Sequence, residues 1–354
     1  MQPSPLHLST LTIALLCTLT FFQVGNVAVA QRRIQKPKTI GHECLEREFR
    51  AAGINGATVR QATALLDDII KDVANRLPSR INSADPQQAR LCFKTIEGTL
   101  AARRFYVVIP TATLMDTMIP SPAPSGTKQL TQARREAIRH SPGAPCHRMD
   151  CDTGSLLFAS IGEALGLPIV VVEAPGHKFV RWKLTGRQQI NWDTNAAREY
   201  SDDDFRRGRT LTYKATISPT EEATGKYLTS LSRDELLAYH SNIVAQILEQ
   251  RGQYAAAEKE YRHAVKKRSH DSLASNNLAW LYLDQPTLRT ASNVRTALEL
   301  AERAVAILPR NRDYLDTLAR AYAANGQFEN ALATEKRGYN NRSRIRQYQE
   351  RKAH

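Results

Sequence analysis

Three residues whose side chains can carry out covalent catalysis lie close together near the middle of the chain. Cys151 opens an apolar, helix-like segment, His177 follows a Pro-Gly turn, and Asp193 ends a β-rich run. A cysteine thiolate is a strong nucleophile, an imidazole can take up and return its proton, and a carboxylate can orient the imidazole. The three residue types therefore suit a thiol enzyme that acts on amide or peptide bonds through a thioester.

The position of Cys151 in its helix affects how readily its thiol ionises. We expect this residue at the N-terminus of the helix, where unpaired N–H groups and the helix dipole favour a thiolate. The neighbouring carboxylates of Asp150 and Asp152 would raise the pKa of the thiol if they pointed at the sulfur. We expect one of the two to cap the helix and to face away from the sulfur.

The pairing of His177 with Asp193 depends on a predicted hairpin. If residues 184–186 form a three-residue loop, with Gly186 in the left-handed conformation, His177 lies directly opposite Asp193. Directly opposed residues share one face of a sheet, with Cβ atoms about 5 Å apart. The carboxylate could then hold an imidazole nitrogen, whereas a slip of one residue would separate the two groups.

The surrounding segments predict an α+β domain, in which helices pack against an antiparallel sheet. Apolar residues recur at helical spacing over 59–77, over 86–102 and again after Cys151, where Gly166 supplies a C-terminal stop. Strand-like segments cover 105–109, 167–173, 177–183 and 188–193. A helix followed by consecutive strands is typical of this class.

The C-terminal third of the chain repeats a pattern with a period of 34 residues. Leu-Ala or Val-Ala pairs, Gly-Gln-aromatic turns and single alanines return at this spacing over about 237–341, with six extra residues between Tyr282 and Ala297. Helix pairs of this length stack and share one continuous core. The pattern resembles three tetratricopeptide repeats, an all-α domain that would bind a protein or peptide partner.

The central motifs are similar to those of the transglutaminase-like superfamily, and most of all to its SirB1-like bacterial branch, in which such a domain precedes tetratricopeptide repeats. The similar segments read DCDTGSLLFASIGEALGLP, APGHKFVRW and INWDT. The resemblance covers about 45–230 and implies a papain-like domain without a cofactor. Cys151 would be the nucleophile, His177 the general base and acid, and Asp193 its orienting partner. The superfamily includes transamidases, peptidases, deamidases and inactive members.

Two other interpretations of the same residues stay open. Cys146, His147, Cys151 and His177 could hold a zinc ion, although their spacing is not a common one and Asp193 would have no role. The central domain could also be a catalytically inactive scaffold, with the repeats as the working surface for protein–protein interaction.

The first thirty residues predict an export signal. They contain no Lys, Arg, Asp or Glu, Leu11–Val24 is almost continuously apolar, and Ala28–Ala30 has the spacing of a signal-peptidase site. Because Arg32 and Arg33 follow directly, an uncleaved membrane anchor is the alternative. Export would place the protein in the periplasm or cell envelope.

Four cysteines follow the predicted signal, an even number that permits disulfides in an oxidising compartment. A Cys44–Cys92 bridge is one pairing. A Cys146–Cys151 bridge would block the candidate nucleophile or control it by its redox state.

The formal net charge of +14 is concentrated toward the two ends of the chain. Basic residues gather in a predicted linker, 31–44, and in a predicted basic tail, 342–354. We expect solvated tails, with an anionic envelope surface as the second interpretation. An exported protein would meet such a surface before DNA, so we do not expect nucleic acid as a partner.

Overall fold

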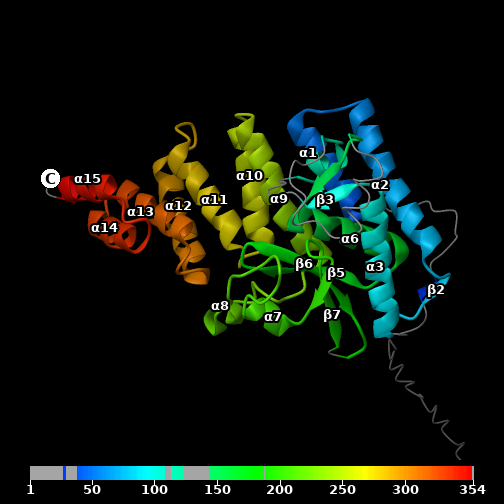
Figure 1. Ribbon diagram of the computed structural model, residues 1–354. Helices are drawn as coiled ribbons and strands as arrows, with labels where there is room; N and C mark the ends of the chain where they lie inside the picture. Colours follow the sequence, from blue (N-terminus) through cyan, green and yellow to red (C-terminus); the bar gives the residue numbers. More distant parts are fainter. Residues whose placement is uncertain (1–26, 29–37, 108–112, 123–142, 187, 353–354) are drawn as a thin grey trace, which may run out of the picture.

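The computed structural model describes residues 27–28, 38–107, 113–122, 143–186 and 188–352 (Figure 1). The predicted export signal, 1–30, lies outside these residues except for Val27–Ala28, and so does 31–37 of the predicted linker. The linker was predicted to extend to residue 44, but helix α1 begins at Ile40. In the part that is described, no helix is both long and apolar enough to cross a membrane.

Helices α1 to α4 form the N-terminal part of the molecule. Their bounds are Ile40–Ala52, Ala57–Arg76, Pro86–Ala102 and Leu114–Met118. The second and third of these match the helices predicted from apolar spacing. Helix α3 begins where expected because Asp85 caps it, accepting a hydrogen bond from the N–H of Gln87, and Pro86 takes the first position, where no N–H is needed.

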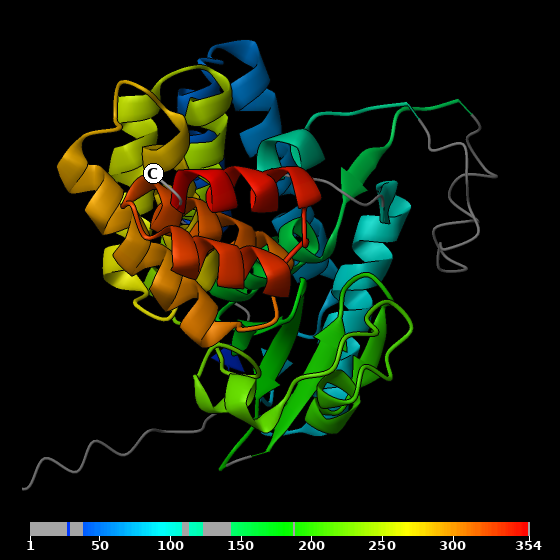
Figure 2. The same cartoon turned by 90° about the vertical axis from the view of Figure 1, so that its left-hand side faces the viewer.

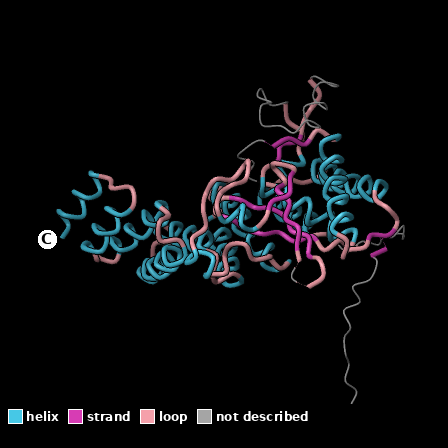
Figure 3. The backbone as a smooth tube through the Cα atoms, turned by 60° about the horizontal axis from the view of Figure 1, so that its bottom comes forward, coloured by secondary structure: helices cyan, strands magenta, loops and turns pink. Residues whose placement is uncertain are grey.

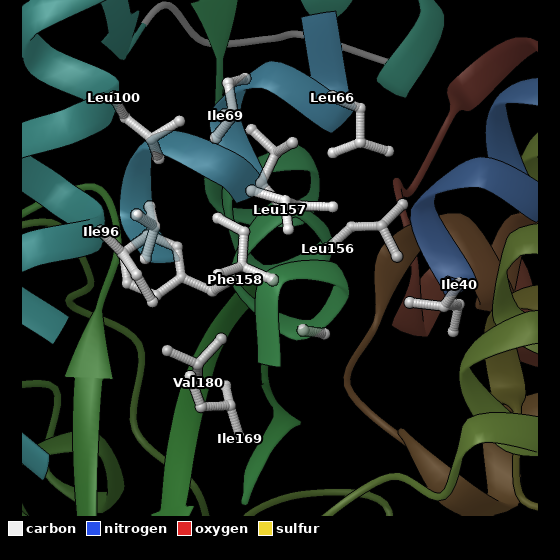
Figure 4. Packing of buried hydrophobic residues seen from close by; sticks show 14 of the residues in the cluster. Ile40, Leu66, Ile69, Ile96, Leu100, Leu156, Leu157, Phe158, Ile169 and Val180 are labelled. Carbon is white, nitrogen blue, oxygen red and sulfur yellow. The ribbon is translucent and has the colours of Figure 1, made fainter. Parts of the chain in front are cut away.

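Helix α6, Cys151–Leu165, is the centre of the hydrophobic core. It packs on strands β5 and β6 and on helices α1 and α2. Gly166 ends it in the left-handed conformation (φ 67°), which an L side chain rarely adopts. Buried side chains from all these elements gather around it (Figure 4), among them Ile40, Leu66, Ile69, Leu156, Leu157, Phe158, Ile169 and Val180.

The main sheet has four antiparallel strands in the order β5-β6-β7-β8. The strands are Ile169–Ala174, His177–Lys183, Gln189–Asp193 and Arg198–Tyr200. Two small pairs lie apart from it: β1 (Val27–Ala28) with β2 (Arg80–Ile81), and β3 (Phe105–Val107) with β4 (His147–Met149), the latter parallel. The α+β class is therefore confirmed, while the parallel pair was not predicted.

The register of the β6–β7 hairpin differs from the predicted one. Val180 lies opposite Trp192, a shift of two residues, because the N–H of Leu184 bonds the carbonyl of Gln188 (3.1 Å) and so places the loop one residue later. His177 and Asp193 are consequently diagonal neighbours and are not directly opposed. A shift of two residues keeps every side chain on its face, so both still point to the same side of the sheet.

Seven helices form the C-terminal part of the molecule, each packed on the one before it. They are α9 Arg233–Gln250, α10 Tyr254–Lys267, α11 Ser272–Asp284, α12 Ala291–Ile307, α13 Arg312–Ala324, α14 Phe328–Arg337 and α15 Arg342–Lys352. Figure 1 shows them in succession from the sheet to the C-terminus, and in Figure 2 the last of them, α15, faces the viewer. The repeated alanines of the sequence pattern are fully buried between helices: Ala245, Ala257, Ala279, Ala297, Ala319 and Ala331.

The segment expected to be a basic tail, 342–354, contains helix α15 instead. Its Tyr348 is 5% exposed and packs with Ala319 and Ala331. This apolar contact holds the helix to the preceding pair despite its many Arg and Lys residues. Most of its basic residues are exposed, but Arg344 is half-buried and pairs with Asp316 of α13 and with Glu335 of α14 (3.4 Å), so charge contacts also hold the helix.

The N-terminal and C-terminal parts share a continuous interface. Figure 3 shows the strands in the middle of the molecule, with the C-terminal helices extending away on one side. Val172 and Phe179 of the sheet belong to the same apolar cluster as residues of α9 and α11. Glu48 of α1 accepts a hydrogen bond from His240 of α9 (2.8 Å), and both side chains are almost fully buried. Short helices α7, Asp202–Arg206, and α8, Pro219–Ala223, lie in the connection between the parts.

Candidate active site

Cys151 is the first residue of α6, as predicted. Asp150 caps the helix: its Oδ1 accepts hydrogen bonds from the N–H groups of Asp152 (3.0 Å) and Thr153 (3.1 Å). The hydroxyl of Thr153 in turn accepts from the N–H of Asp150 (3.0 Å), which completes a reciprocal cap. The expectation that one flanking aspartate caps the helix is confirmed.

His177 and Asp193 are hydrogen-bonded despite the changed register. The Nε2 of His177 donates to Oδ2 of Asp193 (3.1 Å). The same carboxylate accepts from the hydroxyl of Thr212 and from the N–H groups of Asn195 (2.9 Å) and Ala196 (3.0 Å). Burial alone would raise the pKa of the Asp193 carboxyl, but the hydrogen bonds from these groups hold it below its ordinary value. Asp193 is therefore ionised and fixed as an acceptor.

The ring of His177 is held by aromatic stacking as well. Tyr213 lies 5.6 Å away between ring centroids, at 18° to the imidazole plane, and Phe205 lies 6.1 Å away. His177 itself is only 6% exposed. Since Nε2 is engaged by Asp193, Nδ1 is the nitrogen left for a second partner, and it has no hydrogen bond within the described part of the chain.

The thiol of Cys151 interacts with Lys178, the residue after His177: the backbone and the ammonium of Lys178 both act to lower the pKa of the thiol. The structure describes both the Cys151 sulfur and the His177 ring and places no hydrogen bond between them. Two of the three predicted residues, His177 and Asp193, are thus hydrogen-bonded to each other, and Cys151 interacts with the residue that follows the histidine.

The environment of the thiol contradicts the expectation of a lowered pKa. Burial raises the pKa of Cys151 to about 12, and the carboxylates of Asp152 and Asp150 also raise it. The ammonium and the N–H of Lys178 act in the opposite direction without prevailing. Desolvation of a thiolate outweighs the helix N-terminus here, because Cys151 is mostly shielded from water.

Asp152 is held by two side chains that the sequence pattern did not indicate. The Nζ of Lys178 donates to Oδ1 (2.9 Å), and the hydroxyl of Tyr239, on α9, donates to Oδ2 (3.0 Å). The ammonium also sits 3.5 Å from the centroid of the Tyr239 ring. Lys178 is 7% exposed, whereas the side chain of Asp152 is 31% exposed, so the cluster lies at the edge of the buried interior. A residue of the C-terminal part thereby contacts the first turn of the helix that carries Cys151.

The buried charges continue from this cluster into the C-terminal helices. Glu173 accepts a hydrogen bond from Arg268 and lies 3.6 Å from the ammonium of Lys178. Arg268 also donates to Asp271 (2.8 Å), which caps α11. Burial would raise the pKa of Glu173, but Lys226, Lys178 and Arg268 together lower it well below its ordinary value. The carboxylate is ionised and paired.

The disulfides considered from the sequence are absent from the structure, which describes all four cysteines and shows each as a free thiol. Cys44, Cys92 and Cys146 are fully buried, whereas Cys151 is partly exposed. The zinc interpretation also lacks a site: within the described ranges, no three His, Cys, Asp or Glu side chains are arranged to hold a metal ion. Nδ1 of His147 instead donates to the carbonyl oxygen of Thr117 (3.0 Å), and its ring stacks on Phe105.

Comparison with known proteins does not place the chain in a family. Neither a scan against models of protein families nor a search of curated proteins finds a match. The similarity to transglutaminase-like proteins and to tetratricopeptide repeats therefore depends on the motifs of the sequence and the geometry described above.

Proposed function

We propose that this protein is an exported thiol enzyme of the transglutaminase-like kind, which hydrolyses amide or peptide bonds or transfers their acyl group. The observation that supports this most strongly is the hydrogen bond from His177 to an ionised Asp193, beside a cysteine at a helix N-terminus. In this proposal the C-terminal helices are tetratricopeptide repeats that recruit a protein or peptide, and the basic ends face an anionic envelope surface.

In the proposed reaction His177 takes up and returns a proton, and Cys151 is acylated and then released. Nδ1 of His177 takes the thiol proton as Sγ of Cys151 attacks the carbonyl carbon of the substrate. The C–N bond then breaks, the imidazolium gives its proton to the departing amine, and an acyl thioester remains on Cys151. Water attacks the thioester for hydrolysis, or a second amine attacks it for transfer, while Nδ1 of His177 takes a proton from the attacking group. The C–S bond breaks, and the imidazolium returns this proton to the sulfur, which restores the thiol. Asp193 keeps the ring oriented and stabilises its cation.

A second candidate function is that of an inactive scaffold whose repeats bind other proteins. The observation that favours it is the protonated thiol: with a pKa of about 12 and no hydrogen bond to the imidazole, Cys151 is not a preformed nucleophile. At pH 7 a thiol with this pKa is ionised to only about one part in 10⁵.

The pH dependence of alkylation by iodoacetamide separates the two functions. Exposure alone would make Cys151 react before the three fully buried cysteines, so selectivity is not sufficient. If His177 accepts the thiol proton, Cys151 reacts readily at pH 6–7, and His177→Ala slows it at least about tenfold. The exposed His263 on α10 provides the control variant, His263→Ala, which should not alter the rate.

The scaffold is supported instead if the rate at Cys151 only rises steadily toward high pH and is unchanged in His177→Ala. The sites of modification are read by mass spectrometry of the digested protein. Circular dichroism of each variant shows that the fold is retained.

A further inference from the structure

A cleft of about 530 Å³ lies where the sheet meets the C-terminal helices. Pro175–Gly176 and His177 line it from the sheet side, and Leu308, Arg310 and Tyr314 line it from the side of α12 and α13. The candidate general base therefore faces a space whose opposite wall belongs to the repeat-like helices. A substrate in this cleft would contact both parts of the protein at once.

Three hydrogen-bond donors of the cleft have no acceptor in the described structure. Lys226 is 6% exposed, and the nearest carboxylate oxygen to its Nζ, on Asp271, is 3.9 Å away, beyond hydrogen-bonding distance. The hydroxyl of the buried Tyr227 makes no hydrogen bond to a described residue, and Arg310 forms no ion pair with one. The charge of Lys226 is compensated by Asp271 and Glu173, while its N–H donors make no hydrogen bond to a described residue and remain available to a ligand in the cleft.

The carboxylates that line the same cleft already have donors. Asp152 and Glu173 are bonded to the cationic groups described above. Glu221, at the start of α8, accepts from the N–H (2.9 Å) and the hydroxyl (2.8 Å) of Ser218. The side-chain groups that remain available to a ligand in the cleft are therefore hydrogen-bond donors. Two of them, Lys226 and Arg310, are cationic.

We propose that this cleft binds the acyl donor through a carboxylate, which accepts hydrogen bonds from Lys226 on one wall and Arg310 on the other. The substrate class is then a peptide with a carboxylate near the bond that is attacked, held with its carbonyl toward His177 and Asp152, the lining residue next to Cys151. This inference rests on the proposed function and adds to it the kind of substrate that the enzyme would accept. Arg310 makes the C-terminal helices a part of the substrate site.

Calorimetric titration of the Cys151→Ala variant tests the binding without any turnover. The ligands are the amide of N-acetyl-Ala-Glu-Ala, the matched amide of N-acetyl-Ala-Gln-Ala, and N-acetyl-trialanine with a free C-terminus. We expect binding of the glutamate peptide, of the free C-terminus, or of both, which identifies the source of the carboxylate. The glutamine peptide should bind at least about tenfold more weakly, since charge-assisted hydrogen bonds to the buried ammonium are lost.

Two substitutions localise the binding. Lys226→Met and Arg310→Ala should each weaken binding of the preferred peptide at least about tenfold. Arg303→Ala is the control, because Arg303 is an exposed arginine of α12 that does not line the cleft and should leave binding unchanged. Since Arg310 is exposed, its removal should not affect folding.

The proposal is overturned if the glutamine peptide binds as tightly as both carboxylate peptides, or if Lys226→Met and Arg310→Ala bind normally. Inorganic phosphate that binds more tightly than either carboxylate peptide would also overturn it, by indicating a phosphate site. Each of these results is independent of whether Cys151 is a nucleophile. Normal peptide binding with His177-independent alkylation would instead contradict the catalytic function.

Discussion

Replacing Arg268 with methionine should strongly destabilise the protein, because this side chain joins the sheet to the C-terminal helices from a fully buried position. Its guanidinium is 0% exposed and bonds Glu173 of β5 on one side and Asp271 at the start of α11 on the other. In Arg268→Met, Glu173 keeps only the ammonium of Lys178, at 3.6 Å, as a close direct partner. Breaking one side of a buried ion pair typically costs about 3–5 kcal/mol, because a charge stays buried without compensation.

The free energy of unfolding at pH 7, from urea titrations followed by circular dichroism, measures this cost. Arg207→Met is the matched control: Arg207 pairs with Asp203 at 3.0 Å, but the two side chains are 64% and 40% exposed. Such surface pairs contribute about 0–1 kcal/mol. If Arg268→Met costs no more than Arg207→Met, the buried charges do not hold the two parts together and the reasoning fails.

The same comparison has a predicted pH dependence. The pKa of Glu173 is lowered in the folded protein, so its contribution to stability is complete above its unfolded pKa of about 4.3 and is lost as the pH falls through the lower folded value. In Arg268→Met the carboxyl accepts a proton more readily. The difference in stability between wild type and Arg268→Met should therefore narrow below about pH 4. A difference that stays constant from pH 7 to pH 3 would refute the assignment to this charge pair.

Two further predictions concern the helix that carries the thiol. Asp150→Asn keeps a capping acceptor but removes a carboxylate that raises the pKa of Cys151. Iodoacetamide should therefore alkylate Cys151 about two- to tenfold faster at pH 7 in this variant than in the wild type. An equal or slower rate would contradict this prediction. Gly154→Ala should lower the free energy of unfolding by about 1–3 kcal/mol, since a Cβ would lie 2.9 Å from Oγ1 of Thr194 and 3.2 Å from its Cβ. Gly98→Ala, in open space on α3, is its control and should stabilise by about 0.5–1 kcal/mol.

Local patterns in the sequence were sufficient for most of the elements that position the site. The apolar spacing of α2, α3 and α6 and the β-rich runs of β5 to β7 reflect burial on one face or on both, which is a property of each segment alone. The predicted register of the β6–β7 hairpin was wrong, because the sequence does not show at which residue a three-residue loop begins. The site survived that error, since a shift of two residues preserves the face on which His177 and Asp193 lie.

The contacts between distant segments could not be predicted in the same way. Thr212 and Tyr213 reach Asp193 and His177 from an irregular stretch with no periodic pattern. A lysine in a strand, such as Lys178, ordinarily indicates a solvent-facing position, and only the packing of α9 over the sheet shows that it is buried. Such pairings are set by tertiary structure, so a single sequence carries no local signal for them.

The buried thiol of Cys151 determines how this site could work. Because desolvation keeps the thiol neutral, the nucleophile cannot be a standing thiolate, and its proton must move to His177 during attack. The negative charge of Asp152 opposes formation of the thiolate and raises the pKa of Cys151, and the ammonium of Lys178 offsets part of this effect. Lys178 and Tyr239 donate hydrogen bonds to this carboxylate, and Tyr239 belongs to the first of the C-terminal helices. The helical part of the chain therefore helps to position the charge next to the thiol, and a fragment that ends before α9 would lose the hydroxyl that orients Asp152 even if its sheet and α6 still folded.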